Sequence, residues 1–320
     1  MSESKKNSPS VVLYEATSDD AGQRIDNFLL RYLKGVPKSL VYRILRKGEV
    51  RVNKGRVKAV YRLKQGDLVR IPPIRQDSTV GSEPSKRLKA RLDDTILYED
   101  ERIIAINKPS GMAVHGGSGI NAGVIETLRA LRPDAARLEL VHRLDRDTSG
   151  ILLISKKSSV LRVLHELMRA NKVDKRYLAL LAGSWRKGVQ RVDAPLLKNT
   201  LQGGERVVRV DPEGKPAQTH FKRLERFDEA TLVEVELITG RTHQIRVHSA
   251  WLGSPVLGDT KYGDEAANRR LRQLGLRRLF LHAHKIRFRW PDEKRDTVIE
   301  APLPEALQAV LANLKKRNEV

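Results

Sequence analysis

The chain contains no cysteine, which excludes disulfide bonds and zinc sites built on thiolates. Its apolar runs are all short, and none approaches the roughly 18 residues that a membrane-spanning helix requires. The first ten residues are polar and lack the apolar segment of a secretory signal. From these absences we expect a cytoplasmic protein with no membrane partner.

Signatures of several enzyme classes are also missing. The sequence has neither the Gly-x-x-x-x-Gly-Lys-Ser/Thr loop that binds nucleoside triphosphates nor a Gly-x-Gly-x-x-Gly turn after a strand. The Gly-x-Ser-x-Gly motif of serine hydrolases and the His-Glu-x-x-His motif of zinc enzymes are absent as well. His243 with His248, or His282 with His284, could pair on a metal, but packing or RNA contact explains the same spacings. We therefore expect neither a metal nor a cofactor.

Positive charge, by contrast, is plentiful. The 320 residues include 61 Lys and Arg against 39 Asp and Glu, a formal net charge of +22. Residues 1–75 alone carry 17 basic and 7 acidic side chains, or +10, so the charge is densest at the N-terminal end. An excess of this size indicates a polyanionic partner. Nucleic acid fits better than membrane, because the sequence shows no long basic amphipathic helix.

Two short helices are predicted near the N-terminus. Apolar side chains recur at helical spacing within residues 22–33, and a second apolar stripe runs through residues 38–47. Gly48 favours the left-handed conformation that ends a helix. The rest of the second helix is largely basic, and an ordinary solvated face is the alternative to an RNA-binding one. The candidate RNA-binding residues are Lys38, Arg43, Arg46 and Lys47.

Short strands follow these helices. Val50–Asn53 alternates like a strand, Lys54-Gly55 predicts a turn, and a further strand should end near Ile71. Two helices followed by short strands, together with the segment Gly48–Lys54, resemble the S4 RNA-binding domain over about residues 22–72. The resemblance implies that the cationic face neutralises RNA phosphates and binds in a salt-dependent way.

Composition divides the chain further. Residues 76–95 begin with Gln-Asp-Ser-Thr-Val-Gly-Ser-Glu-Pro-Ser and continue as a mixed charged stretch, which is the composition of a linker. We therefore expect an N-terminal tail at 1–21, an S4 domain at 22–75, a linker at 76–95 and a second domain at 96–320.

The most informative segment of the second domain is His142–Gly150. It places the carboxylate of Asp145 among one histidine and two arginine side chains, and apolar runs flank it on both sides. The run Ile151–Ile154 predicts a buried strand, so the charged segment should be a loop held by the core, a common place for catalytic groups. A surface ion pair is the alternative interpretation for Asp145.

This segment, His-Arg-Leu-Asp-Arg-Asp-Thr-Ser-Gly, resembles the signature of the RluA family of RNA pseudouridine synthases, His-Arg-Leu-Asp-x-x-Thr-Ser-Gly, at every specified position. The resemblance implies that Asp145 is the one essential catalytic residue. Asp147 falls at a variable position and receives no role. Arg143 is a candidate to fill the space that a flipped-out base leaves, with plain phosphate contact as the alternative.

A second element is similar to the same family. The segment Thr239–His248 starts at a glycine-containing turn and then alternates, so that Thr242, Gln244 and Arg246 would share one face if the segment is extended. In the family, the later arginine of this element forms a salt bridge to the catalytic aspartate. The resemblance therefore implies that Arg246 orients Asp145 and keeps it ionised.

Two shorter elements also match. Tyr177, in Lys175–Ala179, corresponds to the active-site tyrosine of the family, whose ring can stack on the target base. An ordinary core tyrosine is the alternative. Asn107–Gly111 matches an element beside the family's active site, but a plain turn at a strand exit explains it equally well, so it contributes no predicted site residue.

Beyond residue 96 the sequence mixes strand and helix patterns. Strands are predicted at 103–106, 177–181, 230–235 and 279–282, and helices at 161–170 and 303–314. Because the strands do not alternate regularly with crossover helices, we expect an α+β fold with a mixed, largely antiparallel sheet rather than a doubly wound one. The resemblances imply the same architecture, with a small S4 domain ahead of a pseudouridine synthase domain.

Together, the resemblances imply an isomerase that converts several specific uridines of large-subunit ribosomal RNA to pseudouridine, as a monomer and without a cofactor. The reaction would break the N1–C1′ bond, turn the base and rejoin it through C5. Asp145 would attack C1′, attack C6 or deprotonate the sugar, and the sequence does not choose among these. The alternatives are a non-catalytic S4 RNA-binding or assembly factor and a metal-dependent RNA hydrolase.

Overall fold

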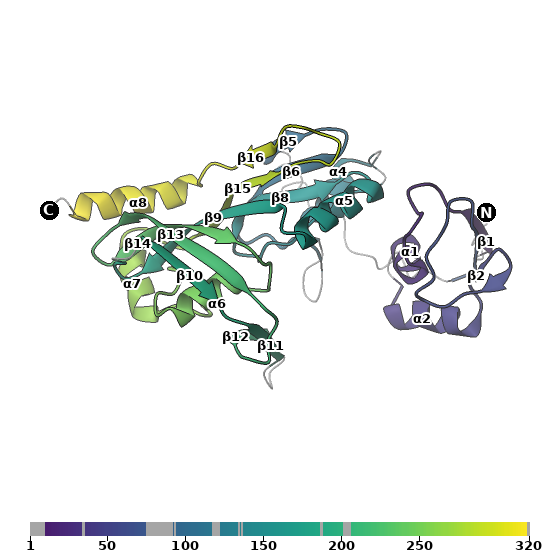
Figure 1. The fold of residues 1–320 in the computed structure, drawn as a ribbon, viewed down its shortest axis with the longest axis horizontal. Helices are drawn as coiled ribbons and strands as arrows, with labels where there is room; N and C mark the ends of the chain where they lie inside the picture. Colours follow the sequence, from purple (N-terminus) through teal and green to yellow (C-terminus); the bar gives the residue numbers. More distant parts are fainter. Residues whose placement is uncertain are drawn as a thin grey trace, which may run out of the picture. The chain divides into compact units, whose positions relative to one another are not determined.

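The computed structural model describes residues 10–33, 36–74, 92, 94–116, 122–133, 135, 137–185, 188–200 and 206–318. These residues divide into two compact units (Figure 1). The first is drawn from residues 1–83 and Lys157–Ser159, and the second from the rest of the chain. Most of the predicted linker, 76–95, lies outside the described residues. None of the described helices is both long and apolar enough to cross a membrane.

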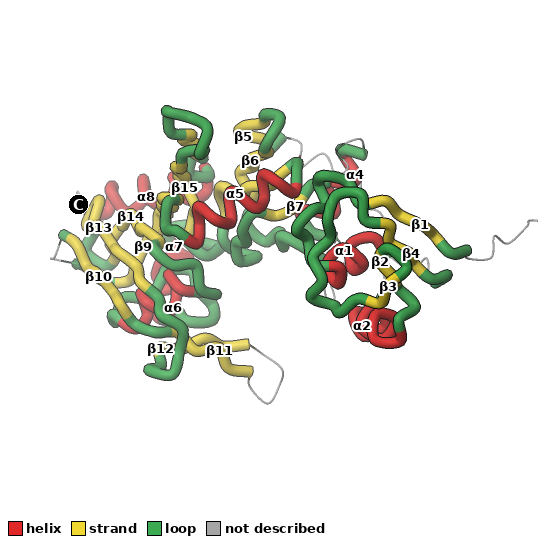
Figure 2. Tube along the Cα trace, turned by 45° about the vertical axis from the view of Figure 1, so that its right-hand side comes forward, coloured by secondary structure: helices red, strands yellow, loops and turns green. Residues whose placement is uncertain are grey.

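The N-terminal unit pairs two helices with a small sheet, and both helices lie beside its strands in Figure 2. Helix α1 (Ile25–Tyr32) and helix α2 (Lys38–Lys47) form where the periodicity predicts them, and Gly48 ends α2 with a φ of 71°. The described strands pair antiparallel in the order β1-β4-β2-β3. They are β1 (Val12–Glu15), β2 (Arg51–Val52), β3 (Gly55–Arg56) and β4 (Leu68–Ile71).

This unit begins earlier than the sequence predicts. Residues 1–21 are predicted to be a tail, yet β1 forms an edge strand in which Val12 lies opposite Ile71. Asp20 is buried and accepts a hydrogen bond from Arg31 of α1 at 2.7 Å. The tail prediction is wrong for this segment, because β1 is a short apolar run that exposes most of its side chains and joins the sheet through backbone pairing, so it does not alternate between apolar and polar residues.

The C-terminal unit is built on one large mixed sheet. In the part of the chain that the structure describes, ten strands join it, most of them in the order β10-β13-β14-β9-β15-β8-β6-β5, with β16 beside β15 and β7 beside β8. Their bounds are β5 (Ile96–Glu99), β6 (Ile103–Lys108), β7 (Glu139–Leu140), β8 (Ser149–Ser155), β9 (Val173–Ala182), β10 (Val189–Asp193), β13 (Gln218–Arg226), β14 (Ala230–Leu237), β15 (Leu281–Phe288) and β16 (Thr297–Glu300). Neighbouring strands run antiparallel except β8 and β15. The predicted α+β fold with a largely antiparallel sheet is confirmed.

Helices cover the sheet at both ends. Helix α5 (Ser158–Arg169) packs on β6 and β8, and every residue of β8 is buried, as predicted for 151–154. Helix α7 (Glu265–Gln273) and helix α8 (Glu305–Asn318) share a core with β9 and β14. Helix α4 (Val124–Leu131) packs into the largest core cluster, which also borders the site described below.

A two-stranded ribbon lies apart from the large sheet. Strands β11 (Leu196–Thr200) and β12 (Arg206–Val210) pair with each other and extend away from the body of the unit in both ribbon views (Figures 1 and 2). Val208, in the middle of β12, shares a small core with Val247 of helix α6 (Gln244–Trp251). The ribbon is therefore anchored beside the helix that carries Arg246.

Candidate active site

The segment between β7 and β8 forms the predicted loop, and a glycine fixes its end. Gly150 adopts a φ of 108°, and a Cβ atom there would overlap the carbonyl oxygen of Ala283. Only glycine allows this close approach. Gly150 comes this close to Ala283 because β8 pairs in parallel with β15 at this point, with Ser149 opposite His282. The last residue of the signature is thus required by the sheet that holds the loop.

The turn after β6 supports the same loop from the protein interior. Lys108 is fully buried, and its Nζ donates to the backbone carbonyls of Pro109 at 3.0 Å, Met112 at 2.9 Å and Arg146 at 2.9 Å. The backbone N–H of Gly111 also donates to the Arg146 carbonyl, at 2.9 Å. Burial lowers the pKa of Lys108 to about 7. The Asn107–Gly111 element is therefore a brace for the loop, a role that the sequence did not separate from that of a plain turn.

A pocket of about 90 Å³ opens beside Asp145. Its walls come from the 141–148 loop, β9, the end of β14, the turn before α6, α6 itself and β15. The four predicted catalytic and substrate-binding residues, Arg143, Asp145, Tyr177 and Arg246, all line it, with Leu144, Thr148, Leu237, Gly240, Arg241, His243, Gln244, Ile245 and Leu281. Segments separated by up to about 140 residues thus converge on one carboxylate.

The element that carries Arg246 is a helix. The prediction that Thr242, Gln244 and Arg246 share one face of an extended segment is therefore wrong. α6 begins at Gln244, whose Oε1 accepts hydrogen bonds from Thr239 Oγ1 at 2.7 Å and from the backbone N–H of Arg241 at 2.9 Å. The first six residues of α6 are all buried. A helix buried on every side has no amphipathic period, so its sequence does not show the 3.6-residue repeat that identifies most helices.

Arg246 lies between two carboxylates. It donates to Asp259 through Nε at 2.7 Å and Nη2 at 2.8 Å, and to Asp145 Oδ2 through Nη1 at 3.3 Å. Burial would lower the pKa of Arg246, but the hydrogen bonds and charge of Asp259, with the charge of Asp145, raise it. The guanidinium is therefore a permanent cation, fixed bidentately by Asp259 with one N–H left for Asp145.

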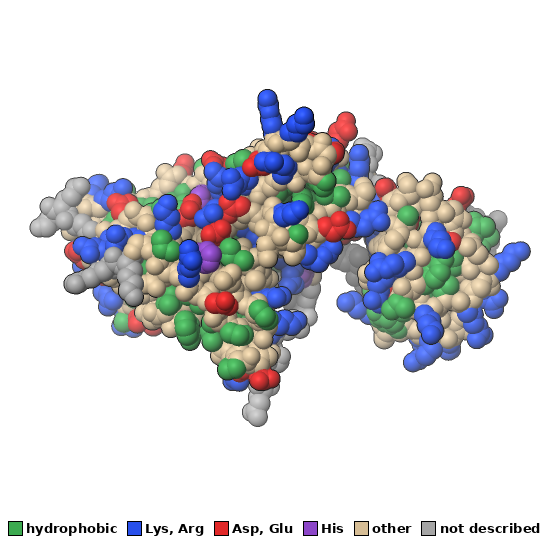
Figure 3. All heavy atoms as spheres, in the orientation of Figure 1, with side chains coloured by type: hydrophobic (Ala, Val, Ile, Leu, Met, Phe, Trp, Pro, Cys, Tyr) green, Lys and Arg blue, Asp and Glu red, His purple; other side chains and the backbone are tan. Residues whose placement is uncertain are grey.

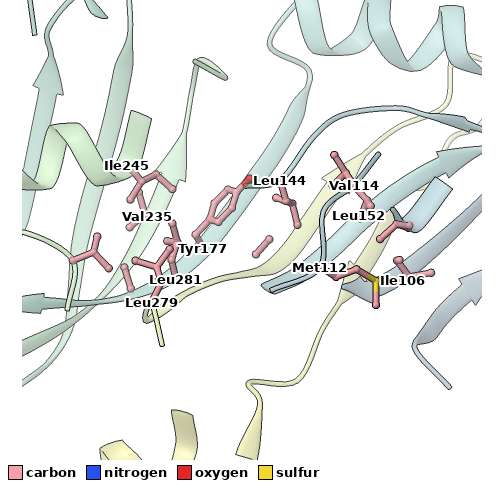
Figure 4. Packing of buried hydrophobic residues seen from close by; sticks show 14 of the residues in the cluster. Ile106, Met112, Val114, Leu144, Leu152, Tyr177, Val235, Ile245, Leu279 and Leu281 are labelled. Carbon is pink, nitrogen blue, oxygen red and sulfur yellow. The ribbon is translucent and has the colours of Figure 1, made fainter. Parts of the chain in front are cut away.

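Tyr177 rises from β9 into the wall of the pocket. Figure 4 shows its ring standing between Leu144 on one side and Val235 and Ile245 on the other. Burial, together with the charge of Asp145, raises the pKa of Tyr177. The phenol therefore keeps its proton at any working pH and offers a flat apolar face and an O–H donor rather than a base.

A histidine and a tyrosine complete the surroundings of Asp145. His243 Nε2 lies 3.8 Å from Asp145 Oδ2, and His243 Nδ1 lies 2.8 Å from Tyr262 Oη. The Tyr262 ring also lies 5.0 Å from the Arg246 guanidinium carbon, within the range of a cation–π contact. The carboxylate of Asp145, 27 % exposed, thus faces the pocket from among polar partners.

The remaining predicted residues are solvent-exposed. Arg143 is exposed on the loop two residues before Asp145. In the N-terminal unit, basic side chains spread over the visible face with few acidic ones between them (Figure 3). All four candidate RNA-binding residues of α2 are exposed, and none forms an ion pair with a described residue: Lys38, Arg43, Arg46 and Lys47.

The histidine pairs considered as metal ligands have other partners. His248 contacts Thr219 Oγ1 at 2.8 Å and the Ala194 carbonyl at 2.9 Å. His282 lies 2.9 Å from Ser149 Oγ. Among the residues that the structure describes, no group of three or more His, Asp or Glu side chains is arranged to hold a metal ion.

Sequence reasoning missed Asp259 and Tyr262. Both lie in Gly258–Gly263, a turn bounded by glycines with polar residues between them, which is typical of a functional loop. Asp259 is fully buried. Burial would raise its pKa, but Arg246 and two backbone N–H groups lower it. A buried aspartate is not visible in a sequence without knowledge of its arginine partner.

Comparison with known proteins gives consistent results. A model of the RNA pseudouridylate synthase family matches residues 102–251, and a model of the S4 domain matches residues 23–69. The chain is 55% identical over 310 residues to the ribosomal large subunit pseudouridine synthase C of Haemophilus ducreyi, covering 96% of this chain and 97% of the relative. It is 56% identical over 315 residues to the protein of the same name in Escherichia coli, covering 97% and 99%.

Solved structures agree on the fold. Human RNA pseudouridylate synthase domain containing 4 is 28% identical with a TM-score of 0.59, covering 72% of this chain and 96% of that one. Human RNA pseudouridylate synthase domain containing 1 is 23% identical with a TM-score of 0.55, covering 73% and 98%, and shows likeness of fold alone.

Proposed function

The chain belongs to the RNA pseudouridylate synthase family, and from that membership we propose that it isomerises uridines of large-subunit ribosomal RNA through the carboxylate of Asp145. The observation that carries the role of Asp145 is its placement in a pocket with Arg246 at 3.3 Å and Tyr177 in the wall. The RNA is proposed from the names of relatives that span almost the whole chain.

The reaction explains why these residue types are needed. Isomerisation breaks the N1–C1′ bond, turns the uracil and joins C5 to C1′. C5 loses a proton and N1 gains one, so no electrons are exchanged. A carboxylate held beside an arginine can act as a nucleophile at C1′ or C6, or as a base toward the sugar. Each route uses the carboxylate of Asp145, which Arg246 holds through Nη1 at 3.3 Å.

The substrate-binding roles follow from position. Tyr177 presents a neutral aromatic ring on which the flipped uracil can stack. Flipping a base out of folded RNA costs a few kcal/mol. In this proposal Arg143, which is exposed and lines the pocket two residues before Asp145, enters the vacated stack and offsets that cost.

The N-terminal unit supplies RNA affinity in this proposal. Its exposed α2 cations, Lys38, Arg43, Arg46 and Lys47, can contact phosphates, which carry no sequence information but fix register. The choice of uridine then depends on the RNA shape that both units accept.

Two experiments test the function. The purified protein should release tritium from C5-labelled large-subunit ribosomal RNA in proportion to the pseudouridine formed. Ribosomal RNA from a strain lacking the gene should lose pseudouridine at specific positions, and the wild-type gene should restore them. If neither tritium release nor a missing modification is found, the proposal is wrong.

A further inference from the structure

His243 lies at the edge of the pocket in an uncommon backbone conformation. Its φ of 54° and ψ of 19° are in the left-handed region, which only a few per cent of non-glycine residues adopt, with Asn, Asp and His the most frequent among them. The ring makes two specific contacts, one from Nε2 toward Asp145 and one from Nδ1 to Tyr262. An unfavourable conformation kept at a functional site points to a use for the imidazole.

Hydrogen-bond partners favour one position for the proton of the imidazole ring. The backbone N–H of Val208 in β12 donates to Tyr262 Oη at 3.1 Å, and a backbone N–H can only donate. Among the described partners of Tyr262 Oη, His243 Nδ1 is then the one that can accept the phenol proton. The proton of the neutral ring then lies on Nε2, the nitrogen that faces Asp145. A carboxylate attracts an N–H and repels a lone pair, so both sides of the ring favour the same tautomer.

The protonation states fit this arrangement. Burial lowers the pKa of His243. The charged groups that face the ring oppose one another: Asp145 and Asp259 raise this pKa, while Arg246 and Lys261 lower it. Burial also raises the pKa of Tyr262, so its hydroxyl keeps the proton that it donates. The ring is therefore a neutral, oriented donor.

Both neighbours of the carboxylate contact the same oxygen. Arg246 Nη1 lies 3.3 Å and His243 Nε2 lies 3.8 Å from Asp145 Oδ2. The longer distance exceeds a hydrogen bond, but such contacts in enzymes without substrate commonly tighten in the complex. Two donors on Oδ2 would leave Oδ1 free to meet the substrate.

We propose that His243 is a positioning residue: held by Tyr262 with its proton on Nε2, it directs that N–H at Asp145 Oδ2 and presents Oδ1 to the nucleoside. The inference rests on the proposed catalytic role of Asp145. The residue acts through Asp145 and takes no part in bond making itself.

Two amide substitutions separate the ring nitrogens. Gln carries an amide nitrogen near the place of Nε2, whereas Asn reaches only the place of Nδ1. His243→Gln should therefore retain more activity than His243→Asn. Partners that orient a functional group are worth about 10- to 100-fold, and we expect the Asn variant to lose that much in kcat with little change in KM.

If His243 has a purely structural role, the order of activity of the two variants should be reversed. Asn is far better than Gln at a positive φ, so the Asn variant would then be the more stable and the more active of the two. Single-turnover rates on a uridine-containing RNA fragment, with thermal melting of each variant, distinguish these outcomes. Equal or higher activity of His243→Asn would overturn the positioning role.

A second variant tests the arrangement Tyr262–His243–Asp145 at its tyrosine end. Tyr262→Phe keeps the ring over Arg246 and removes only the hydroxyl. We expect a kcat loss close to that of His243→Asn, unchanged RNA affinity, and no further loss when the two changes are combined. If the kcat losses of the two single variants were fully additive in the double variant, Tyr262 would not act through His243.

Asp145→Asn serves as the reference in the same assay. If this variant keeps its turnover, the proposed function itself fails. If it is inactive but the His243 variants show the structural order, only the positioning role fails.

Discussion

Arg246 shows how one residue can join two parts of the site. Its bidentate pairing with the fully buried Asp259 fixes the guanidinium, and the remaining Nη1 reaches Asp145. A buried charge that loses its partner is strongly destabilising, so Asp259 is needed for the fold as well as for the site. The sequence identified Arg246 through its motif but gave no sign of Asp259.

His282 is a single residue that makes the free energy of unfolding depend on pH. It is fully buried between Ser149 Oγ at 2.9 Å and the Ala301 carbonyl at 3.3 Å. Burial lowers the pKa of His282 from 6.5 to about 4, with a smaller lowering by Arg278. The unfolded chain therefore binds this proton between pH 6.5 and 4 while the folded chain does not, and stability falls as the pH falls through that window.

The expected loss from His282 is about 2 kcal/mol between pH 7 and pH 5. Urea unfolding of the wild type and of His282→Asn at both pH values measures it. The variant should be less stable at pH 7 but should lose about 2 kcal/mol less on acidification. Parallel losses in the two proteins would show that His282 does not titrate in this way.

At the scale of elements, regular patterns were predictable and buried ones were not. The amphipathic helices α1, α2, α5 and α8 appear near their predicted positions, because each shows an apolar stripe with helical spacing. Helix α6 was hidden by burial on every side, and β1 by exposure of its side chains. β15 begins at Leu281 rather than at residue 279. A local sequence pattern reveals an element that buries one of its faces. Elements that bury no face, or bury every face, lack such a pattern and are missed.

The turn after β6 leads to a prediction about the catalytic loop. Lys108→Met keeps the length of the side chain and removes all three bonds to backbone carbonyls. Each buried carbonyl left without a donor costs about 1–3 kcal/mol. We expect a clear loss of unfolding free energy, and a larger fall in kcat than rise in KM, because the loop that carries Asp145 is then held at the Arg146 carbonyl by the Gly111 N–H alone.

Lys156→Met is the matched control for this prediction. Lys156 pairs with Glu99 at 2.6 Å and also donates to the backbone carbonyl of Asp100, both partly exposed contacts outside the loop. Its loss should cost about 1–2 kcal/mol, less than the loss of the three Lys108 bonds, and leave kcat unchanged. If the two variants behaved alike in stability and turnover, the bracing role of Lys108 would be refuted.

At the scale of the whole molecule, the densest positive charge and the proposed catalytic residues lie in different units. The net charge of +10 in residues 1–75 lies far in sequence from Asp145, Tyr177 and Arg246. Charge counting predicted a nucleic-acid partner, and the motifs predicted RNA and the residues that line the pocket. Neither could show how Arg246 is held, because that depends on contacts between segments with no local signal.

This division predicts a selective effect on binding. Replacing the four α2 cations with Gln should weaken RNA affinity and lower the slope of log affinity against log salt by about 0.7 for each phosphate of single-stranded RNA that the protein no longer neutralises. Turnover at saturating RNA should persist. The variant changes Lys38, Arg43, Arg46 and Lys47.

The control for this experiment removes the same charge elsewhere. Four exposed cations of the C-terminal unit are replaced with Gln: Lys172, Lys222, Lys294 and Arg295. Filter binding over a range of salt concentrations compares the two variants. Equal slopes would mean that net charge alone, and not the α2 surface, sets the affinity.

The most direct test of the catalytic assignment compares two neighbouring aspartates. Asp145→Asn removes one negative charge from the pocket with almost no change of shape, and Asp147→Asn makes the same change two residues away on the same loop. Pseudouridine formed in large-subunit ribosomal RNA is measured by tritium release, with RNA affinity and melting temperature as checks on folding. We predict no detectable product from Asp145→Asn despite near-normal binding, and near wild-type turnover from Asp147→Asn. Substantial pseudouridine formation by a folded Asp145→Asn variant would contradict the role of Asp145.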